Sequence, residues 1–296
     1  MALSEVPSVM NSVLESCPMN NKKPLADLRY LFAVLNPFTK LIPAKERILG
    51  LRFWAYKFDV VGRAIFKTET YDPLISRWLV DRYKGKSCVF IDIGANLGYF
   101  TCLLGVLAGD KGVVIAFEPE PENLELLRTN VAVNGLGSVV KIAPIALGET
   151  EGTANLNVYK KSNRGRHSIL GTSGVSSISV PLKTLDKVIE ELLPSESRID
   201  FMKMDVEGYE PFVLRGGQSV LGRVECMLME YAPYLIEKSG VDLREFMVNV
   251  RSNFAHIYQV CETDFVAISV DDVLSRKDAI DLLFSKSPIA PIAPIP

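Results

Sequence analysis

Hydrophobic positions in the middle of the chain alternate between short apolar runs and stretches with helical spacing. Residues 89–93 form an apolar run with β-branched side chains, and apolar positions recur at helical spacing over 97–104. Residues 113–117 form a second run, which an amphipathic segment at 120–134 follows. This order of strand and helix is typical of a parallel sheet with helices on both faces. The central part of the chain is therefore predicted to have an α/β fold.

The same pattern continues along the chain, with one interruption. Helices are predicted at 73–83, 184–189, 208–221 and 243–253, and strands at 139–147, 201–206, 225–231, 255–261 and 281–284. The interruption covers residues 149–182, where residues alternate as in exposed strands around a Ser-, Gly- and Lys/Arg-rich stretch at 160–174. We expect a β-rich insertion there, with a loop that could cover a substrate.

The chain is predicted to have three parts. Residues 1–68 are expected to form a mostly helical extension, because apolar residues recur at helical spacing between 24 and 50, although 60–66 look like a strand or hairpin arm. The apolar face of this extension would be buried against the main domain, or against a membrane or a partner. Residues 69–287 form the main domain. The tail at 288–296 repeats proline, which favours an extended polyproline II conformation.

Composition narrows the class of protein. A chain of 296 residues with 48% hydrophobic content can bury the core of one α/β domain. Its net charge of −2 provides no basic field, so nucleic acid is not expected as a partner. The five cysteines lack metal-type spacing and suit reduced thiols, and no metal site is predicted from them. With neither a secretory signal nor a membrane-spanning run in view, a cytoplasmic protein is expected.

The turn after the first strand indicates the kind of ligand. Its glycines, Gly94 and Gly98, flank Asn96, which stands where a dinucleotide-binding turn needs a second glycine close to the pyrophosphate. A pyrophosphate would meet the side chain of Asn96, so nicotinamide and flavin cofactors are disfavoured. S-adenosylmethionine (SAM) has a ribose and an adenine but no phosphate, and it tolerates Asn96.

Acidic residues near this turn are candidates for holding such a ligand. Glu118 ends the second strand, where a carboxylate can hold ribose hydroxyls; it could instead only stabilise the start of the next helix. Asp92 could hold the amino group of SAM or orient the turn by accepting its N–H groups. Glu69 and Tyr71 lie just before the first strand, in a segment that could fold back over the pocket.

Asp205 and Glu207 are the candidates for the acceptor side. They follow the fourth strand two positions apart, so both point toward the same edge of the sheet. Such a pair could take a proton from a hydroxyl or bind a divalent cation, although the sequence shows no third ligand; it could also be only an acidic helix start. His167, in the basic loop, is a second candidate base. His256 is expected to be structural.

Four segments in order resemble the motifs of the FkbM-type SAM-dependent methyltransferases: 89–101, 117–123, 180–186 and 202–210. The resemblance implies the class I methyltransferase fold, a seven-stranded and mostly parallel sheet whose last strand is antiparallel. It also implies O-methylation of hydroxyls, often on sugars or secondary metabolites.

Carried over by position, the resemblance assigns roles to the candidate residues. Asp92, Gly94, Asn96 and Gly98 would line the methionine side of SAM, and Glu118 would hold its ribose. Asp205 and Glu207 would face the transferred methyl group or the acceptor. The acceptor, a small molecule or a glycan, is not named by the sequence, and neither is the oligomeric state.

Two other functions remain open on the sequence. The first is a SAM-binding scaffold without catalysis, and the second is a nucleotide-dependent enzyme built on a similar sheet. Asn96 argues against the second, and the full set of acidic candidates argues against the first.

Overall fold

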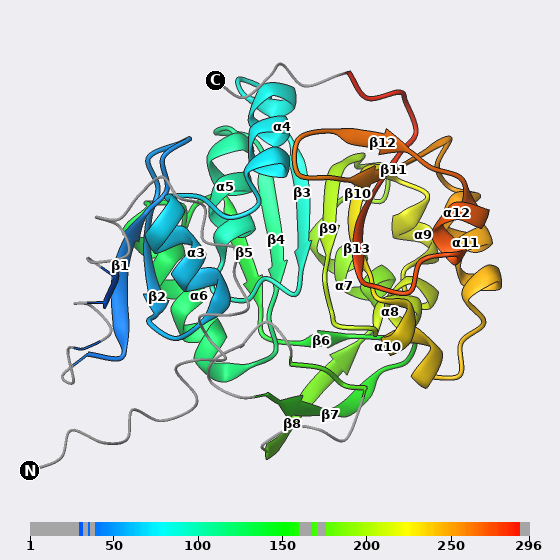
Figure 1. The fold of residues 1–296 in the computed structure, drawn as a ribbon, viewed down its shortest axis with the longest axis horizontal. Helices are drawn as coiled ribbons and strands as arrows, with labels where there is room; N and C mark the ends of the chain where they lie inside the picture. Colours follow the sequence, from blue (N-terminus) through cyan, green and yellow to red (C-terminus); the bar gives the residue numbers. More distant parts are fainter. Residues whose placement is uncertain (1–29, 32–34, 36–38, 160–166, 171–175, 291–296) are drawn as a thin grey trace, which may run out of the picture.

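An eight-stranded sheet forms the centre of the molecule (Figure 1), in a computed structural model that describes residues 30–31, 35, 39–159, 167–170 and 176–290. The strand order is β12-β11-β13-β10-β9-β3-β4-β5. The strands are β3 (Val89–Ile93), β4 (Val113–Phe117), β5 (Val140–Ala143), β9 (Ile199–Met204), β10 (Val224–Tyr231), β11 (His256–Val260), β12 (Phe265–Ala267) and β13 (Ile280–Ser285).

The pairing confirms the predicted α/β class and a mostly parallel sheet. Strands β5, β4, β3, β9 and β10 run parallel, and β13 pairs antiparallel with both β10 and β11. The predicted number of seven strands is wrong, because β12 adds an eighth at the edge next to β11. This short strand carries only three residues, and its apolar run is too short to give a clear period.

Helices cover both faces of the sheet, as the strand pattern requires. Along β3, Phe90 packs into the core on one side, whereas Ile91 and Ile93 pack into the core on the other. The first side carries α4 (Pro73–Tyr83), α5 (Tyr99–Leu107) and α6 (Pro121–Val133). The second side carries α7 (Leu185–Leu192), α8 (Glu210–Arg215), α9 (Gln218–Leu221), α10 (Pro233–Lys238), α11 (Leu243–Arg251) and α12 (Val270–Leu274).

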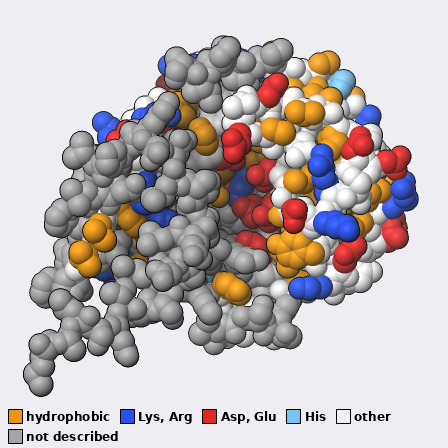
Figure 2. All heavy atoms as spheres, viewed as in Figure 1, with side chains coloured by type: hydrophobic (Ala, Val, Ile, Leu, Met, Phe, Trp, Pro, Cys, Tyr) orange, Lys and Arg blue, Asp and Glu red, His pale blue; other side chains and the backbone are white. Residues whose placement is uncertain are grey.

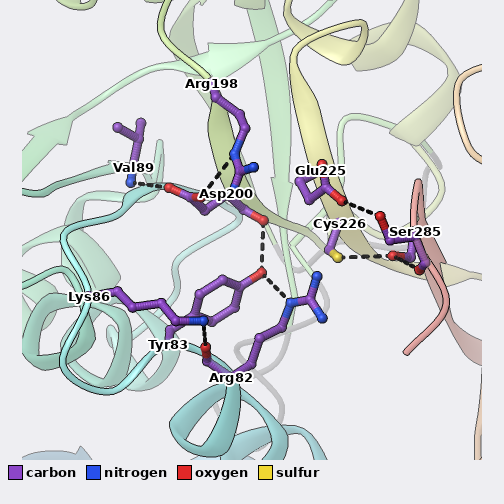
Figure 3. A network of polar contacts seen from close by, with 10 residues as sticks. Arg82, Tyr83, Lys86, Val89, Arg198, Asp200, Glu225, Cys226 and Ser285 are labelled. Carbon is purple, nitrogen blue, oxygen red and sulfur yellow. Dashed lines mark hydrogen bonds and ion pairs between the residues drawn. The ribbon is translucent and has the colours of Figure 1, made fainter. Parts of the chain in front are cut away.

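A polar network fixes α4 to the amino ends of the strands (Figure 3). The hydroxyl of Tyr83 donates to the backbone carbonyl of Asp200 at 2.8 Å and accepts from Nε of Arg82 at 3.2 Å. The Asp200 carboxylate accepts the backbone N–H of Val89 at 2.9 Å. Because these contacts join α4, β3 and β9, the parallel strands are held in register at the edge opposite the carboxyl ends.

The part of the N-terminal extension that the structure describes differs from the helical prediction. β1 (Leu41–Lys45) and β2 (Arg52–Tyr56) form an antiparallel hairpin, and α3 (Val60–Thr68) is a helix where a strand or hairpin arm was predicted. The side chain of Asp59 caps α3 by accepting the N–H groups of Val61 and Gly62, which outweighs the β-branched pair at its start.

The hairpin is attached to the main domain through Asn130 of α6. The buried Asn130 side chain donates to the carbonyls of Trp54 and Leu97 at 3.0 and 2.8 Å, and it accepts the Trp54 N–H at 2.7 Å. A residue of the extension is thereby connected to the loop that follows β3. The hairpin therefore supports the turn at the carboxyl end of that strand.

The predicted β-rich insertion forms a separate three-stranded sheet. Its strands are β6 (Ala146–Leu147), β7 (Gly152–Val158) and β8 (Ser176–Lys183), with β8 in the middle. The single strand predicted at 139–147 is two strands in different sheets, because Pro144 lacks an N–H and interrupts the ladder between them. Most of the predicted covering loop lies outside the described residues, as do residues 1–29 and 291–296. In the described helices, no segment is both long and apolar enough to cross a membrane.

Candidate functional site

A cavity of about 350 Å³ lies at the carboxyl ends of the parallel strands, within the size range of small-molecule sites. Figure 2 shows acidic side chains gathered in a hollow near the middle of the face it views. The wall of the cavity is made by residues at the carboxyl ends of β3, β4, β9 and β10 and by residues of the insertion. They include Tyr71, Gly94, Asn96, Glu118, Asn123, Ile145, Leu156, His167, Lys203, Asp205, Glu207, Tyr209, Glu230 and Tyr234.

The glycines of the turn after β3 are required by their positive φ, and Gly94 also by close packing against backbone. Gly94 has φ +76°, and a Cβ there would lie 1.9 Å from the backbone oxygen of Asp205. Gly98 has φ +89°, and a Cβ there would lie 2.5 Å from a methyl group of Leu127. Both positions need a residue that adopts positive φ at little cost, which is glycine because it has no side chain. The first glycine brings the turn directly against the segment that carries Asp205.

Asn96 and Glu118 lie together in the cavity wall. Asn96 has φ +52°, and its backbone N–H donates to Oε2 of Glu118 at 2.7 Å, while Oε1 accepts the Glu120 N–H at 2.9 Å. Glu118 is only 5% exposed, and burial raises the pKa of its carboxyl to about 7 against the lowering effect of these hydrogen bonds. Each carboxylate oxygen retains lone-pair capacity for a hydroxyl of a ligand.

Three of the predicted donor-side residues, Gly98, Asp92 and Glu69, are not among the residues that line the cavity. Asp92 is fully buried below the turn, where Oδ2 accepts a hydrogen bond from the Thr101 hydroxyl at 2.5 Å; its carboxylate bonds to no N–H of the glycine turn. Burial raises the pKa of this carboxyl. Glu69 is the exposed C-cap of α3, with φ 59°. Tyr71, two residues later, does line the cavity and packs edge-on against Tyr99, with ring centroids 5.6 Å apart.

Asp205 and Glu207 lie together in the cavity wall, and a third carboxylate joins them. Oxygen atoms of Asp205, Glu207 and Glu230 all lie within 4.8 Å of one another. Burial, followed by the charges of Asp205 and Glu207, raises the pKa of Glu230 to about 9. Sequence reasoning missed Glu230 because only the pairing of β10 beside β9 brings it to Asp205. The sequence does contain one feature that could have indicated Glu230, which is an acidic residue in an otherwise apolar predicted strand.

Lys203 is a second residue that sequence reasoning missed. Its Nζ donates to the backbone oxygen of Gly94 at 3.1 Å and to Oδ2 of Asp205 at 3.3 Å. Burial of the ammonium lowers its pKa, but the charges of Asp205 and Asp92 outweigh burial, so the pKa is raised overall. Lys203 is therefore a cation at neutral pH. The feature of the sequence that could have indicated this residue is a lysine inside the apolar run of β9.

His167 lies in the cavity wall, and one of its ring nitrogens accepts a hydrogen bond from the backbone. Its Nδ1 accepts the backbone N–H of Tyr159 at 2.9 Å. A neutral imidazole that accepts at Nδ1 carries its proton on Nε2, so it presents a donor instead of a base at that nitrogen. In this tautomer Nε2 would donate to a ligand, and the role of His167 as a base stays a prediction. His256 lies in β11, stacked on Tyr258 and away from the cavity.

The cavity wall suits the nucleoside part of SAM. The buried carboxylate of Glu118 can accept from ribose hydroxyls, and it lies 2.7 Å from the backbone nitrogen of Asn96. Asn123 lies in the same wall, and its buried Oδ1 has no hydrogen-bond partner among the described residues. Buried polar atoms are rarely left unpaired. An unpaired amide oxygen in the same cavity wall as Glu118 therefore fits a ligand that brings its own donors.

Comparison with known proteins gives the family. Residues 92–265 match the model of the methyltransferase FkbM domain, more than half of the chain. Methyltransferase sdnD of Sordaria araneosa is 29% identical over 153 residues, which cover 43% of this chain and 59% of that protein. Hexuronic acid methyltransferase AglP of Haloferax volcanii is 28% identical over 144 residues, which cover 48% and 55%. The matches thus span less than two thirds of the length of these two relatives.

Among solved structures, the methyltransferase domain of METTL16 aligns over 83% of this chain and 87% of its own, with 13% identity and a TM-score of 0.43. The family model covers both the glycine turn at 94–98 and the acidic segment at 205–207. The chain belongs to the FkbM methyltransferases, a family whose methyl donor is SAM.

Proposed function

We propose that this chain transfers a methyl group from SAM to a hydroxyl of a sugar or a small secondary metabolite. The observation that carries the proposal is that one cavity contains both Glu118, beside the glycine turn, and the carboxylate of Asp205. A donor site and a proton acceptor therefore open into the same space. The names of the relatives, which include a hexuronic acid methyltransferase, support a sugar-like acceptor.

The residues of the chain would bind the donor and take up a proton. When bound, SAM supplies a methyl group on a sulfonium that leaves as a neutral thioether. Glu118 would accept hydrogen bonds from the ribose, and Asn96 would cover the adjacent edge. Asp205 would accept the proton of the acceptor hydroxyl as the oxygen forms its bond to the methyl carbon. Because the donor is already activated, positioning supplies much of the acceleration.

Asp205 is a better proton acceptor than the other groups in the cavity. Its side chain is 38% exposed, so a substrate hydroxyl can reach it. Glu230, with a pKa raised to about 9, carries a proton at neutral pH and would donate to an oxygen instead. Nδ1 of His167 is already occupied by a backbone N–H. Glu207 lies beside Asp205 and would contact the same part of the acceptor.

The alternative with a divalent cation gains one ligand from the structure. Glu230 supplies the third carboxylate that the sequence did not show, next to Asp205 and Glu207. Carboxylate oxygens are the ligands that Mg²⁺ and Mn²⁺ prefer. Acidic side chains also gather without an ion, and the mechanism with Asp205 as base needs none. A chelation experiment separates the two versions.

The test is transfer of a labelled methyl group from SAM into fractions of an extract of the source cell. Fragmentation of the labelled product by mass spectrometry would locate the methyl group. The proposal expects an ether on a hydroxyl oxygen of a glycan or small molecule. A label on nitrogen or carbon, or on a carboxylate as an ester, would contradict it. A non-catalytic scaffold would bind SAM in a titration but transfer no label to any fraction.

A further inference from the structure

The buried lysine of β9 connects the two halves of the cavity. The two hydrogen bonds of Lys203 run to the carbonyl of Gly94 on the donor side and to the carboxylate of Asp205 on the acceptor side. We propose that Lys203 is a positioning residue for methyl transfer, which holds the Asp205 carboxylate at a fixed place relative to the donor turn. This role rests on the function proposed above.

Lys203 is held firmly enough to serve as a reference point. The residue is 7% exposed, and its ammonium lies 5.8 Å from the centre of the Phe100 ring. It stands in β9 opposite Asp92 of β3, in the middle of the parallel sheet. A buried ammonium is costly unless it is paired and hydrogen-bonded. The place of Lys203 is thus fixed by its partners and by the packing of its stem.

The donor turn does not depend on Lys203 for its own shape. The N–H groups of Gly94 and Ala95 both donate to the carbonyl of Phe117, at 3.1 and 3.0 Å, and the Asn96 N–H donates to Glu118. Removal of the lysine would leave all three of these bonds in place. The Gly94 carbonyl is therefore a fixed acceptor to which the ammonium is attached.

Asp205, in contrast, depends on Lys203 for the position of its side chain. Among the described residues, Lys203 is the group that hydrogen-bonds or ion-pairs with the Asp205 carboxylate. The nearby carboxylate of Glu207 repels it, and Glu230, which is protonated at neutral pH, brings no positive charge to hold it. Without the ammonium, the half-exposed carboxylate would turn toward solvent. The loss should therefore affect the acceptor step more than donor binding.

The test replaces the ammonium and keeps the stem. In Lys203→Met, we expect kcat to fall about 10- to 100-fold, as for a misplaced catalytic group, while the Kd for SAM changes by less than about threefold. A lysine with only a structural role would lower the amount of folded enzyme but not kcat per SAM-binding site. The matched control is Lys187→Met, which removes an exposed lysine from its ion pair with Glu151, 2.7 Å away. That variant should match the wild type in both quantities.

A double-mutant cycle asks whether Lys203 acts through Asp205. If it does, Lys203→Met combined with Asp205→Asn should be no slower than Asp205→Asn alone. Multiplicative losses in the double variant would overturn the proposal, as would a weaker Kd for SAM with unchanged kcat. The rates are measured with the acceptor that the labelling experiment identifies. A label on a nitrogen atom would contradict the proposed function alone, because the cycle would still decide the role of Lys203. No transfer by the wild type would contradict both.

Discussion

The backbone N–H of Asn96 donates to Oε2 of Glu118 at 2.7 Å, which joins the turns after β3 and β4. We propose that the same carboxylate meets the ribose of SAM, so that one side chain would both shape the turn and contact the donor. Asn96 has φ +52°, a backbone conformation that residues other than glycine adopt at some cost. The bond to Glu118 helps to hold it there.

Glu118→Ala should weaken SAM binding about 10- to 100-fold, since a hydrogen bond to a charged group contributes about 1.5–3 kcal/mol. The substitution also releases the N–H groups of Asn96 and Glu120. Isothermal titration with SAM measures the change. Glu125→Ala, on the exposed side of α6, is the control and should bind as the wild type does. An unchanged affinity in Glu118→Ala would remove this residue from the donor site.

SAM binding should depend on pH through the same carboxyl. Burial raises the pKa of Glu118 to about 7, so the group is protonated at pH 6 and ionised at pH 8. Ribose hydroxyls bind better to the ionised form, and affinity should therefore rise with pH, by at most about tenfold per unit below the pKa. Titrations at pH 6, 7 and 8 measure the slope. In Glu118→Gln the slope should vanish; a slope that persists there would arise from another group.

Asp205→Asn should lower kcat about 10²- to 10⁴-fold, the usual contribution of a general base, and leave the Kd for SAM within about threefold. The amide keeps the size of the side chain but does not take a proton. Steady-state rates and titration with SAM measure the two quantities separately. Asp110→Asn, in an exposed turn, is the control. A variant at Asp205 with normal turnover would show that another group takes the proton.

Activity should survive removal of divalent cations if Asp205 acts as the base on its own. The experiment is exhaustive dialysis against EDTA, followed by assays with and without added Mg²⁺ or Mn²⁺. Loss of activity that either ion restores would favour a cation at Asp205, Glu207 and Glu230. In that case Glu230→Gln should weaken the response to the added ion, because it removes one of the three carboxylates.

Folding stability should fall as pH rises, in part through Glu210. The Glu210 side chain is buried and accepts the N–H groups of Val206 and Gly208, and burial raises its pKa to about 7. As pH rises, this carboxyl therefore loses its proton at a lower pH in the unfolded chain than in the folded protein. The stabilisation is complete below about pH 4.5 and is lost between there and about pH 7; the total loss over this range is about 3 kcal/mol.

Glu210→Gln carries no ionisable group at this position, so its unfolding free energy should fall less over the same range. Urea denaturation at pH 5 and pH 8 gives the difference between the variant and the wild type. Glu245→Gln, on an exposed helical face, should follow the wild type at both values. Equal slopes for Glu210→Gln and the wild type would mean that the carboxyl is ionised at no cost in the folded protein.

Local patterns account for the parts of the fold that were predicted correctly. The strand at 113–117 was predicted with the bounds that the structure has, and the predicted apolar run of Val89, Ile91 and Ile93 lies in β3, because each is a short apolar run next to a clear helix. The extension was mispredicted where two local signals conflicted. Val60 and Val61 favour a strand, yet Asp59 caps a helix there. In the structure β1 and β2 bury alternate residues, which is the period of strands and not of the predicted helices.

The sequence by itself determined the order of strands and helices, the glycine turn and the acidic residues that follow the strands, because these depend on neighbours in the chain. Only the tertiary structure decided which of them share the cavity. It buried Asp92 under the turn, left Glu69 at an exposed helix end and gave Nδ1 of His167 a backbone partner. It also brought Glu230 to Asp205 and the Lys203 ammonium to the Gly94 carbonyl, since strand pairing joins residues whose separation in the chain carries no periodic signal.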